Sequence, residues 1–273
     1  MAEVTKTQIE NFLNGTNPQV RIIKVEGDYN ESKIHVIYRD ENGKMHIEHD
    51  DFYPFVWCKL SVCTKLFGGN REVLKQQMRA YGIKVKALRT NNSEGFIPER
   101  MENGFKYMFY AAIPMSYTKF LDFFEKGGCP VYGNKNNDTS GKQVQEFIAV
   151  SNTEQYMIST GKRLFKGYND YDDLLRLTWD LETEGLDPHI NAISQIGIYT
   201  NRGYQKIITI EGKTPEEKAA NEIAAIDEFF QIIRQINPDV ITGHNIFNFD
   251  FYFIDVRLEL AGTSMKEFTK DYF

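Results

Sequence analysis

The 273-residue sequence has few cysteines, no long hydrophobic run and no excess of basic residues. Its three cysteines, Cys58, Cys63 and Cys129, cannot all pair with one another, which fits a reducing compartment. A single C-x4-C spacing without a second pair is poor evidence for zinc, so we interpret the cysteines as packing residues. No apolar stretch approaches the roughly 20 residues of a membrane span, and the N-terminus lacks the basic start and apolar core of a secretory signal. We therefore predict a cytoplasmic protein with no membrane partner.

The formal net charge of -6 argues against a chain that simply coats nucleic acid. It does not exclude a nuclease, because the active site of a nuclease can consist of acids that recruit metal ions. Hydrophobic residues at 41% and aromatic residues at 14% argue against a disordered chain. Since a typical domain has about 150 residues, a chain of this length is expected to contain roughly two domains.

The first 168 residues mix strand and helix patterns. Alternating hydrophobic residues predict strands over 20–25, 33–38, 44–48, 52–58, 83–88 and 106–113. Helical spacing predicts a short helix around 9–13 and further helices over 70–81, 116–125 and 153–161. Asn42-Gly43 is typical of a hairpin turn, and the polar stretch 132–142 is interpreted as a loop. We predict an α+β domain over residues 1–168.

A basic cluster lies within this first domain. Its members are Lys75, Arg79, Lys84, Lys86 and Arg89. They could contact a phosphate backbone, but a solvated face is the favoured interpretation.

Residues 169–273 follow an α/β pattern. We predict strands over 174–181, 192–200, 204–211 and 239–242, and helices over 214–236 and 250–261. The longer helix has a well-marked start, with Thr214 as the cap, Pro215 at the first position and Glu217 three residues after the cap. Three strands followed by helix, strand and helix predict a mixed sheet with helices packed on it, as in ribonuclease-H-like nucleases.

Two carboxylates, Asp180 and Glu182, lie at the end of the first of these strands. Because strand side chains alternate between faces, positions 180 and 182 point the same way, while Trp179 and Leu181 point into the opposite layer. Two like charges side by side are costly unless one is protonated or a cation binds, and hard cations such as Mg²⁺ favour oxygen ligands. An acidic strand end that merely faces water is the alternative interpretation.

A second polar segment follows the strand over 239–242. Residues 243–250 (Gly-His-Asn-Ile-Phe-Asn-Phe-Asp) form a turn that leads into a helix and supplies a third acid, Asp250. If this strand is parallel to the first, both acidic segments lie at the carboxyl ends of strands, where α/β sheets bind ligands. Taken alone, Asp250 could be a helix cap and Asn245 a turn former.

These segments resemble motifs of the family B DNA polymerases. Residues 180–183 (Asp-Leu-Glu-Thr) resemble the first exonuclease motif of the family, and residues 243–250 resemble the second, in the right order and at a compatible separation. Residues 51–57 are similar to an N-terminal strand of the family, and residues 156–161 to the segment that leads into its exonuclease domain. The resemblance favours a phage or viral polymerase, which would work in the host cytoplasm.

The resemblance implies a 3′→5′ proofreading exonuclease with two divalent metal ions, Mg²⁺ or Mn²⁺, and a single-stranded DNA 3′ end as substrate. It implies that Asp180 bridges both metals, that Glu182 holds one and that Asp250 holds the other. Single-strand contacts would come from four residues, Thr183, His244, Asn245 and Phe249. The parent polymerase would bind primer-template DNA and could bind a sliding clamp.

The third exonuclease motif of the family, a tyrosine followed four residues later by an aspartate, is not found. Tyr252 is followed by Asp255 only three residues on, and the polymerase palm motifs are also missing. We therefore expect a C-terminally truncated exonuclease domain over 169–273, in a fragment or one subunit of a split polymerase. Its metal site would be incomplete and its activity alone weak or absent, and the remaining polymerase domains or a second subunit would be its partners.

Two alternatives stay open at this point. The first is a standalone DEDD-type 3′→5′ exonuclease acting on DNA or RNA, which requires a fourth acid in the chain. The second is a non-catalytic nucleic-acid-binding module whose acids are structural. Metal binding at Asp180 and Glu182 would separate the enzymes from the module.

Overall fold

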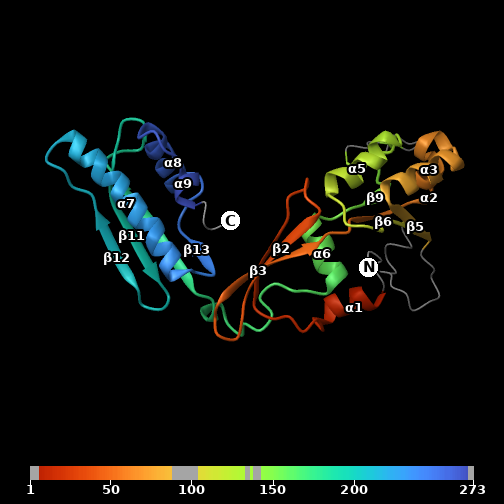
Figure 1. Cartoon of the computed structure of the whole chain (residues 1–273), viewed down its shortest axis with the longest axis horizontal. Coiled ribbons are helices and arrows are strands. Elements are labelled where there is room, and N and C mark those ends of the chain that lie inside the picture. The colour runs from red at the N-terminus through yellow and green to blue at the C-terminus, as the bar shows by residue number, and fades with distance from the viewer. Residues whose placement is uncertain (1–5, 88–103, 133–135, 138–142, 270–273) are drawn as a thin grey trace. The chain divides into compact units, whose positions relative to one another are not determined.

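Figure 1 shows the computed structural model of the chain, which describes residues 6–87, 104–132, 136–137 and 143–269. The chain divides into two compact units, unit 1 (Met1–Gly167) and unit 2 (Tyr168–Phe273). Each unit is described by itself. Within the described ranges, no helix is long and apolar enough to cross a membrane.

Unit 1 contains a three-stranded antiparallel sheet, β1-β2-β3. Its strands are β1 (Ile22–Glu26), β2 (Lys33–Arg39) and β3 (Met45–Asp51). The predicted hairpin joins β2 to β3, and Gly43 has a φ of 78°, which a glycine adopts without strain. The Asp40 carboxylate closes this turn by accepting hydrogen bonds from the backbone N–H groups of Asn42 and Lys44, both at 2.9 Å.

A second sheet in unit 1 has the strand order β5-β6-β4-β9. Its strands are β4 (Phe55–Cys58), β5 (Ile83–Ala87), β6 (Tyr107–Ala111) and β9 (Phe147–Ile148), and its helices are α2 (Leu60–Lys65), α3 (Arg71–Tyr81) and α5 (Tyr117–Lys126). In chain order this is a β-α-β-β-α-β arrangement. One face of the sheet packs against Phe120, Phe123 and Phe124 of α5. Cys58 and Cys129 are buried free thiols in the same core, in agreement with their interpretation as packing residues.

The remaining elements of unit 1 are short. They are α1 (Lys6–Asn14), the 3-10 helix η1 (Leu66–Gly69), β7 (Asn136–Asn137), β8 (Gln143–Val144) and α6 (Asn152–Thr160). The sequence did not predict α2, because a helix of six residues is too short to show periodicity. It also predicted a loop where β7 and β8 pair, and the rest of that loop lies outside the described residues.

A polar cluster ties α6 to β3. The Lys162 ammonium lies 2.9 Å from Asp50 Oδ2, and the Tyr156 hydroxyl also donates a hydrogen bond to Asp50. Burial opposes ionisation of Asp50, but these two donors outweigh it and lower the pKa of the carboxyl below its ordinary value of 3.8. The charged form of Asp50 is therefore more favourable in the folded state than in the unfolded state.

Asp50→Asn should lower the free energy of unfolding near neutral pH by about 1–2 kcal/mol, because a charge-assisted cluster is lost while Asp50 stays partly exposed. Since the folded pKa is lowered, this stability is present above pH 3.8 and is lost as the pH falls through the folded pKa. Denaturant titrations of both proteins across this range test it. Asp51→Asn is the control, because the exposed Asp51 pairs with the half-exposed Lys33. A difference in the free energy of unfolding that persists in strong acid would show that the ionised Asp50 carboxylate is not its cause.

Unit 2 is built on a four-stranded sheet with the order β12-β11-β10-β13. Its elements are the 3-10 helix η2 (Tyr171–Asp173), β10 (Arg176–Thr183), β11 (Ile193–Thr200), β12 (Gln205–Thr209), α7 (Pro215–Ile236), β13 (Val240–Thr242), α8 (Asp250–Leu260) and α9 (Met265–Thr269). The strands β10, β11 and β12 pair antiparallel, and β13 pairs parallel with β10. The predicted mixed sheet is confirmed, although α9 was not predicted.

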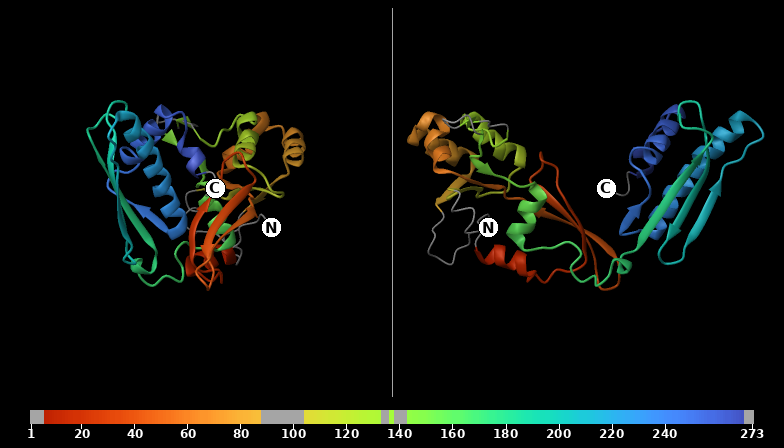
Figure 2. Two further views of the ribbon diagram at one scale, coloured as in Figure 1. Left: turned by 60° about the vertical axis from the view of Figure 1, so that its left-hand side comes forward. Right: turned by 180° about the vertical axis from the view of Figure 1, so that it is seen from behind.

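Helices of unit 2 cover one face of this sheet, and Figure 2 shows α7 lying along it. Trp179 of β10 packs there between Phe229 of α7 and Phe251 of α8, with ring centroids 4.5 and 4.8 Å away. The start of α7 has the predicted cap, because the Thr214 hydroxyl accepts a hydrogen bond from Glu217 N at 3.2 Å. The side chains that alternate with Trp179 therefore lie on the opposite face of the sheet.

Candidate functional site

The acidic residues of β10 lie on its open face. Asp180 and Glu182 are exposed, whereas Trp179 and Leu181 are only 1% and 6% exposed on the helix-covered face. This alternation was predicted from the sequence. The strand continues to Thr183, so both acids lie within its last four residues rather than beyond its end.

Parallel pairing brings the turn after β13 next to Asp180. In the register, Thr178 is opposite Thr242, and their hydroxyl oxygens are 2.8 Å apart. The chain then turns at Gly243, directly against the backbone of Trp179. A Cβ at position 243 would lie 2.7 Å from the Trp179 carbonyl oxygen and 2.1 Å from Ile246 Cγ2, so no larger residue fits.

Asp250 begins α8 and faces the same stretch of β10. Its side chain is 1% exposed, and Oδ1 accepts a hydrogen bond from Leu181 N at 3.1 Å. Burial raises the pKa of the Asp250 carboxyl, and the neighbouring Asp180 carboxylate, which also hydrogen-bonds to it, raises it further against the opposing effect of the Leu181 N–H. The structure therefore places two carboxyl groups in contact, with the proton affinity of one increased.

Glu182 shares the open face with Asp180 but does not join this pair. Across the described part of the chain, no group of three or more His, Cys, Asp or Glu side chains is arranged to hold a metal ion. The structure thus brings together two of the three predicted ligands. The contact between Asp180 and Asp250 is what a bound cation would relieve, so these two residues fit a metal ion, whereas the full three-carboxylate set is not assembled.

The turn over residues 243–249 is held by its own hydrogen bonds. Asn245 has a φ of 55°, and its carbonyl accepts bonds from Asn248 N at 3.0 Å and Phe249 N at 3.1 Å. Its side-chain Oδ1 also accepts a bond from Asn248 Nδ2 at 3.0 Å. The neighbouring His244 is exposed. Asn245 thus serves as a turn residue, and its exposed amide is still available to a ligand.

Two aromatic residues of this turn differ in exposure. Phe249 is partly buried and packs against Phe253, with ring centroids 5.6 Å apart. Phe247 is 79% exposed and was not singled out in the sequence, although its place inside the motif over 243–250 marked it. Thr183, a predicted contact residue, uses its hydroxyl to donate to the Gly185 carbonyl at 2.9 Å. Phe247 is therefore the aromatic ring of the turn that is open to a base.

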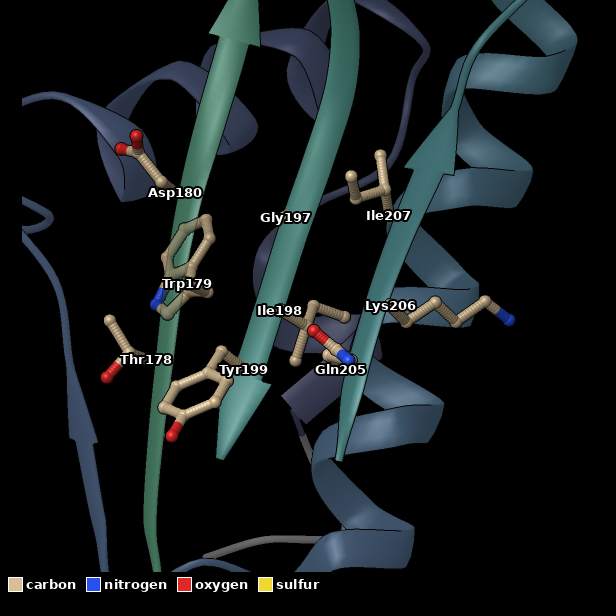
Figure 3. Close-up of a pocket in the computed structure, with 9 residues that line it drawn as sticks. All are labelled: Thr178, Trp179, Asp180, Gly197, Ile198, Tyr199, Gln205, Lys206 and Ile207. Atoms are coloured by element: carbon tan, nitrogen blue, oxygen red, sulfur yellow. The ribbon is translucent and has the colours of Figure 1, made fainter. Parts of the chain in front are cut away.

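A groove lies beside Asp180 on the open face of β10, β11 and β12. Its lining residues are Thr178, Trp179, Asp180, Gly197, Ile198, Tyr199, Gln205, Lys206 and Ile207. Figure 3 shows the Asp180 carboxylate at one end of the groove, on the side of β10 away from β11. Gly197 is paired with Asp180 in the register, so the absence of a side chain there keeps the face open next to the acid.

Gly243→Ala should lower the free energy of unfolding by about 1–3 kcal/mol, because the added methyl group forces the turn away from β10. Chemical denaturation measures the change. Gly197→Ala is the matched control in the same sheet, since the nearest atom to its Cβ would be the Asp180 carbonyl oxygen at 3.9 Å. We expect the control to stay within about 0.5 kcal/mol of the parent. Equal losses in the two variants would contradict the close approach at Gly243.

The mixed sheet, the acidic face of β10 and the buried aspartate at the start of α8 define an α/β unit of the ribonuclease-H-like kind. Comparison with known proteins supports this class of fold. Residues 139–271 match the model of the family described as DNA polymerase family B, exonuclease domain. These 133 residues, just under half of the chain, are similar to that exonuclease domain.

Two relatives illustrate the extent of the similarity. A DNA polymerase from Desulfurococcus sp. (strain Tok) is 24% identical over 237 residues, which cover 83% of this chain and 27% of that protein. The family B DNA polymerase from the hyperthermophilic archaeon Pyrobaculum calidifontis shares the fold, with a TM-score of 0.53 and 15% identity over 88% of this chain and 32% of the other. The chain thus spans about a third or less of the length of these polymerases. A phage or viral origin stays a prediction.

Proposed function

We propose that the chain contributes to 3′→5′ proofreading, the removal of a mispaired 3′ nucleotide from DNA, in a family B DNA polymerase. The observation that carries the proposal is the contact between Asp180 on β10 and the buried Asp250 at the start of α8. Two carboxyl groups held together in this way have an unfavourable interaction that a divalent cation relieves. The match of residues 139–271 to a polymerase exonuclease domain supports this reading over an idle acidic strand end.

We assign Asp180, Glu182 and Asp250 as the residues that would hold Mg²⁺ or Mn²⁺. When bound, such ions supply an activated water and stabilisation of the leaving 3′ oxygen. Within the chain itself, the Leu181 N–H fixes the orientation of the Asp250 carboxylate, and the Thr178–Thr242 contact fixes the turn beside β10. These interactions keep the acids in place before substrate arrives.

The single-stranded end of DNA would lie across the turn over 243–249. The exposed amide of Asn245 and the exposed imidazole of His244 are placed to hydrogen-bond to a terminal nucleotide, and Phe247 can stack on a base without reading sequence. Phe249 stabilises the turn by packing its ring against that of Phe253. Thr183, the last residue of β10, would also contact the single strand.

The domain scheme is also a proposal. We assign residues 1–168 to the N-terminal domain of the polymerase and residues 169–273 to part of its exonuclease domain. The family match starts at residue 139, so the last part of unit 1 belongs to the matched region as well. The partners of this arrangement would be primer-template DNA and the remaining polymerase domains, present in the same protein or in a second subunit.

The proposal is tested by incubating the chain with 5′-labelled single-stranded DNA and Mn²⁺. We expect trimming from the 3′ end to be slow, because the fourth carboxylate of the family motif is not found in this sequence. The trimming should require the metal and fall to background in Asp180→Ala. Glu259→Ala, which removes an exposed acid of α8, is the control and should leave trimming unchanged. Trimming that survives in Asp180→Ala would contradict the proposal.

A parallel assay on RNA distinguishes the standalone alternative. Fast trimming of DNA or RNA by this chain alone, lost in Asp180→Ala, would favour a self-sufficient DEDD-type exonuclease. Such a result would contradict our expectation of an incomplete site.

A further inference from the structure

Two histidines of unit 1 meet across neighbouring strands. His35 lies on β2 and His49 on β3, and the antiparallel register places them directly opposite each other. Their rings are in edge-to-face contact, with centroids 4.6 Å apart. His46, three residues before His49, points to the other face of the sheet, where its ring stacks on that of Tyr38. The contact therefore joins two imidazoles that are 14 positions apart in the sequence.

Both imidazoles are accessible from solvent. Ile34 and Val36, the neighbours of His35 on β2, are 0% exposed in the core of unit 1, so His35 points away from that core. Its side chain is 33% exposed. His49 is exposed as well, while the next residue, Asp50, belongs to the polar cluster at α6 on the other side of the strand. The pair thus lies on the open face of the β1-β2-β3 sheet, where a small ligand can reach it.

The separation of the two rings suits the coordination of one metal ion. With metal–nitrogen distances of about 2.0–2.1 Å, two imidazoles bound at a right angle have centroids about 4.5 Å apart, and two bound at the tetrahedral angle have centroids about 5.2 Å apart. The observed distance of 4.6 Å agrees with the right angle. Right angles between ligands are typical of Cu²⁺ and Ni²⁺ in sites with nitrogen and oxygen ligands, whereas Zn²⁺ prefers a tetrahedron.

The charges around the pair favour a cation. The carboxylate of Glu31 lies 3.6 Å from His35 Nε2, where it can hold the ring in place as outer carboxylates do for metal-bound histidines. Lys33, two residues before His35 on the same face, is paired with Asp51 at 2.6 Å, which offsets its charge. Among the residues that the structure describes, no third His, Cys, Asp or Glu completes a metal-binding group. The pair would therefore supply two ligands, and water molecules the others.

We propose that His35 and His49 bind a single divalent transition-metal ion of the Cu²⁺ or Ni²⁺ kind, with water in the remaining coordination positions. The two nitrogen ligands distinguish this site from the carboxylates of unit 2, whose oxygen atoms suit Mg²⁺ or Mn²⁺. A bound ion would connect β2 to β3 and so stabilise the β1-β2-β3 sheet. The competing interpretation is a cross-strand packing pair that binds no ligand.

The test is isothermal titration calorimetry of the full, untagged chain with NiCl₂, after treatment with EDTA and dialysis. Ni²⁺ is the probe because Cu²⁺ would oxidise the free thiols of the chain. An excess of Mg²⁺ occupies the carboxylates of unit 2, because Mg²⁺ prefers oxygen ligands and competes poorly for imidazole. The test variants are His35→Gln and His49→Gln. The matched control is His46→Gln, which replaces the histidine on the opposite face of β3.

We expect one strong Ni²⁺ site per chain in the parent and in His46→Gln. Loss of a partner outside the coordination shell already weakens metal binding about 10–100-fold, so removal of either ligand should weaken it by at least about tenfold. Ni²⁺ should also raise the melting temperature of the parent but not of His49→Gln, which replaces the exposed ring and provides the same test if His35→Gln does not fold. Unchanged Ni²⁺ affinity in either test variant, equal weakening in the control, or tighter binding of Zn²⁺ than of Ni²⁺ would overturn the proposal.

Discussion

Replacing Arg257 by alanine is expected to lower the free energy of unfolding of unit 2 by about 3–5 kcal/mol, because it leaves a buried carboxylate without its cation. Arg257 lies on α8 and holds Glu222 of α7 through Nε, at 3.0 and 3.1 Å from the two carboxylate oxygens, and through Nη2 at 2.6 Å. Glu222 is 1% exposed. Its Oε1 also accepts a bond from Ile193 N at 2.8 Å, so the pair connects both helices to β11.

Denaturant titration followed by tryptophan fluorescence measures this loss. The chain has two tryptophans, Trp57 in unit 1 and Trp179 in unit 2, so a Trp57→Phe background reports on unit 2. Arg202→Ala is the control, because Arg202 is exposed and its Nη2 only reaches the Asp173 carbonyl at 3.0 Å. A loss below about 1 kcal/mol in Arg257→Ala would show that Glu222 is not held as a charged partner.

The second large effect concerns the paired acids. We expect Mn²⁺ to raise the melting temperature of the chain, by the equivalent of about 2.7 kcal/mol when the metal is present at 100 times its Kd. Asp180→Asn and Asp250→Asn should each lose this response, because each removes one of the two carboxylates in contact. Glu259→Gln, an exposed acid on the same helix as Asp250, should keep it. Differential scanning calorimetry at several metal concentrations measures the shift.

Without metal, the same pair should make stability depend on pH. The folded pKa of Asp250 is raised above its ordinary value of 3.8, chiefly by burial and further by Asp180. The folded state therefore binds the proton more tightly than the unfolded state, and the free energy of unfolding falls as the pH rises from 3.8 through the folded pKa. Asp250→Asn should not show this fall and should be more stable than the parent near neutral pH. An Asp250→Asn protein that is less stable than the parent would contradict the close contact.

Several elements were predictable because their signals are local. The cap at Thr214, the hairpin at Asn42-Gly43 and the alternation of Trp179 and Leu181 with Asp180 each depend on neighbours within a few residues. Local signals predicted the strand over 239–242 as well, and the structure has β13 there. The mixed sheet of unit 2 could therefore be derived from the sequence.

Parts of the candidate site were not predictable in the same way. The motif resemblance pointed to Phe249, yet Phe247 is the exposed ring and Phe249 packs on Phe253. The Glu222–Arg257 pair joins residues 35 positions apart on two helices, which no periodicity connects. The contact between Asp180 and Asp250 likewise depends on the parallel pairing of β10 with β13.

The sequence by itself predicted which residues would carry the chemistry, the acids at 180, 182 and 250. It also determined that the first two share one face of a strand, because this follows from a two-residue period. Only the tertiary structure decided which of the acids meet. Long-range pairing of β10 with β13 and the close approach at Gly243 bring Asp250 to Asp180, bury it and raise its pKa, while Glu182 stays outside the pair. Such proximity depends on how distant segments pack, which local patterns do not encode.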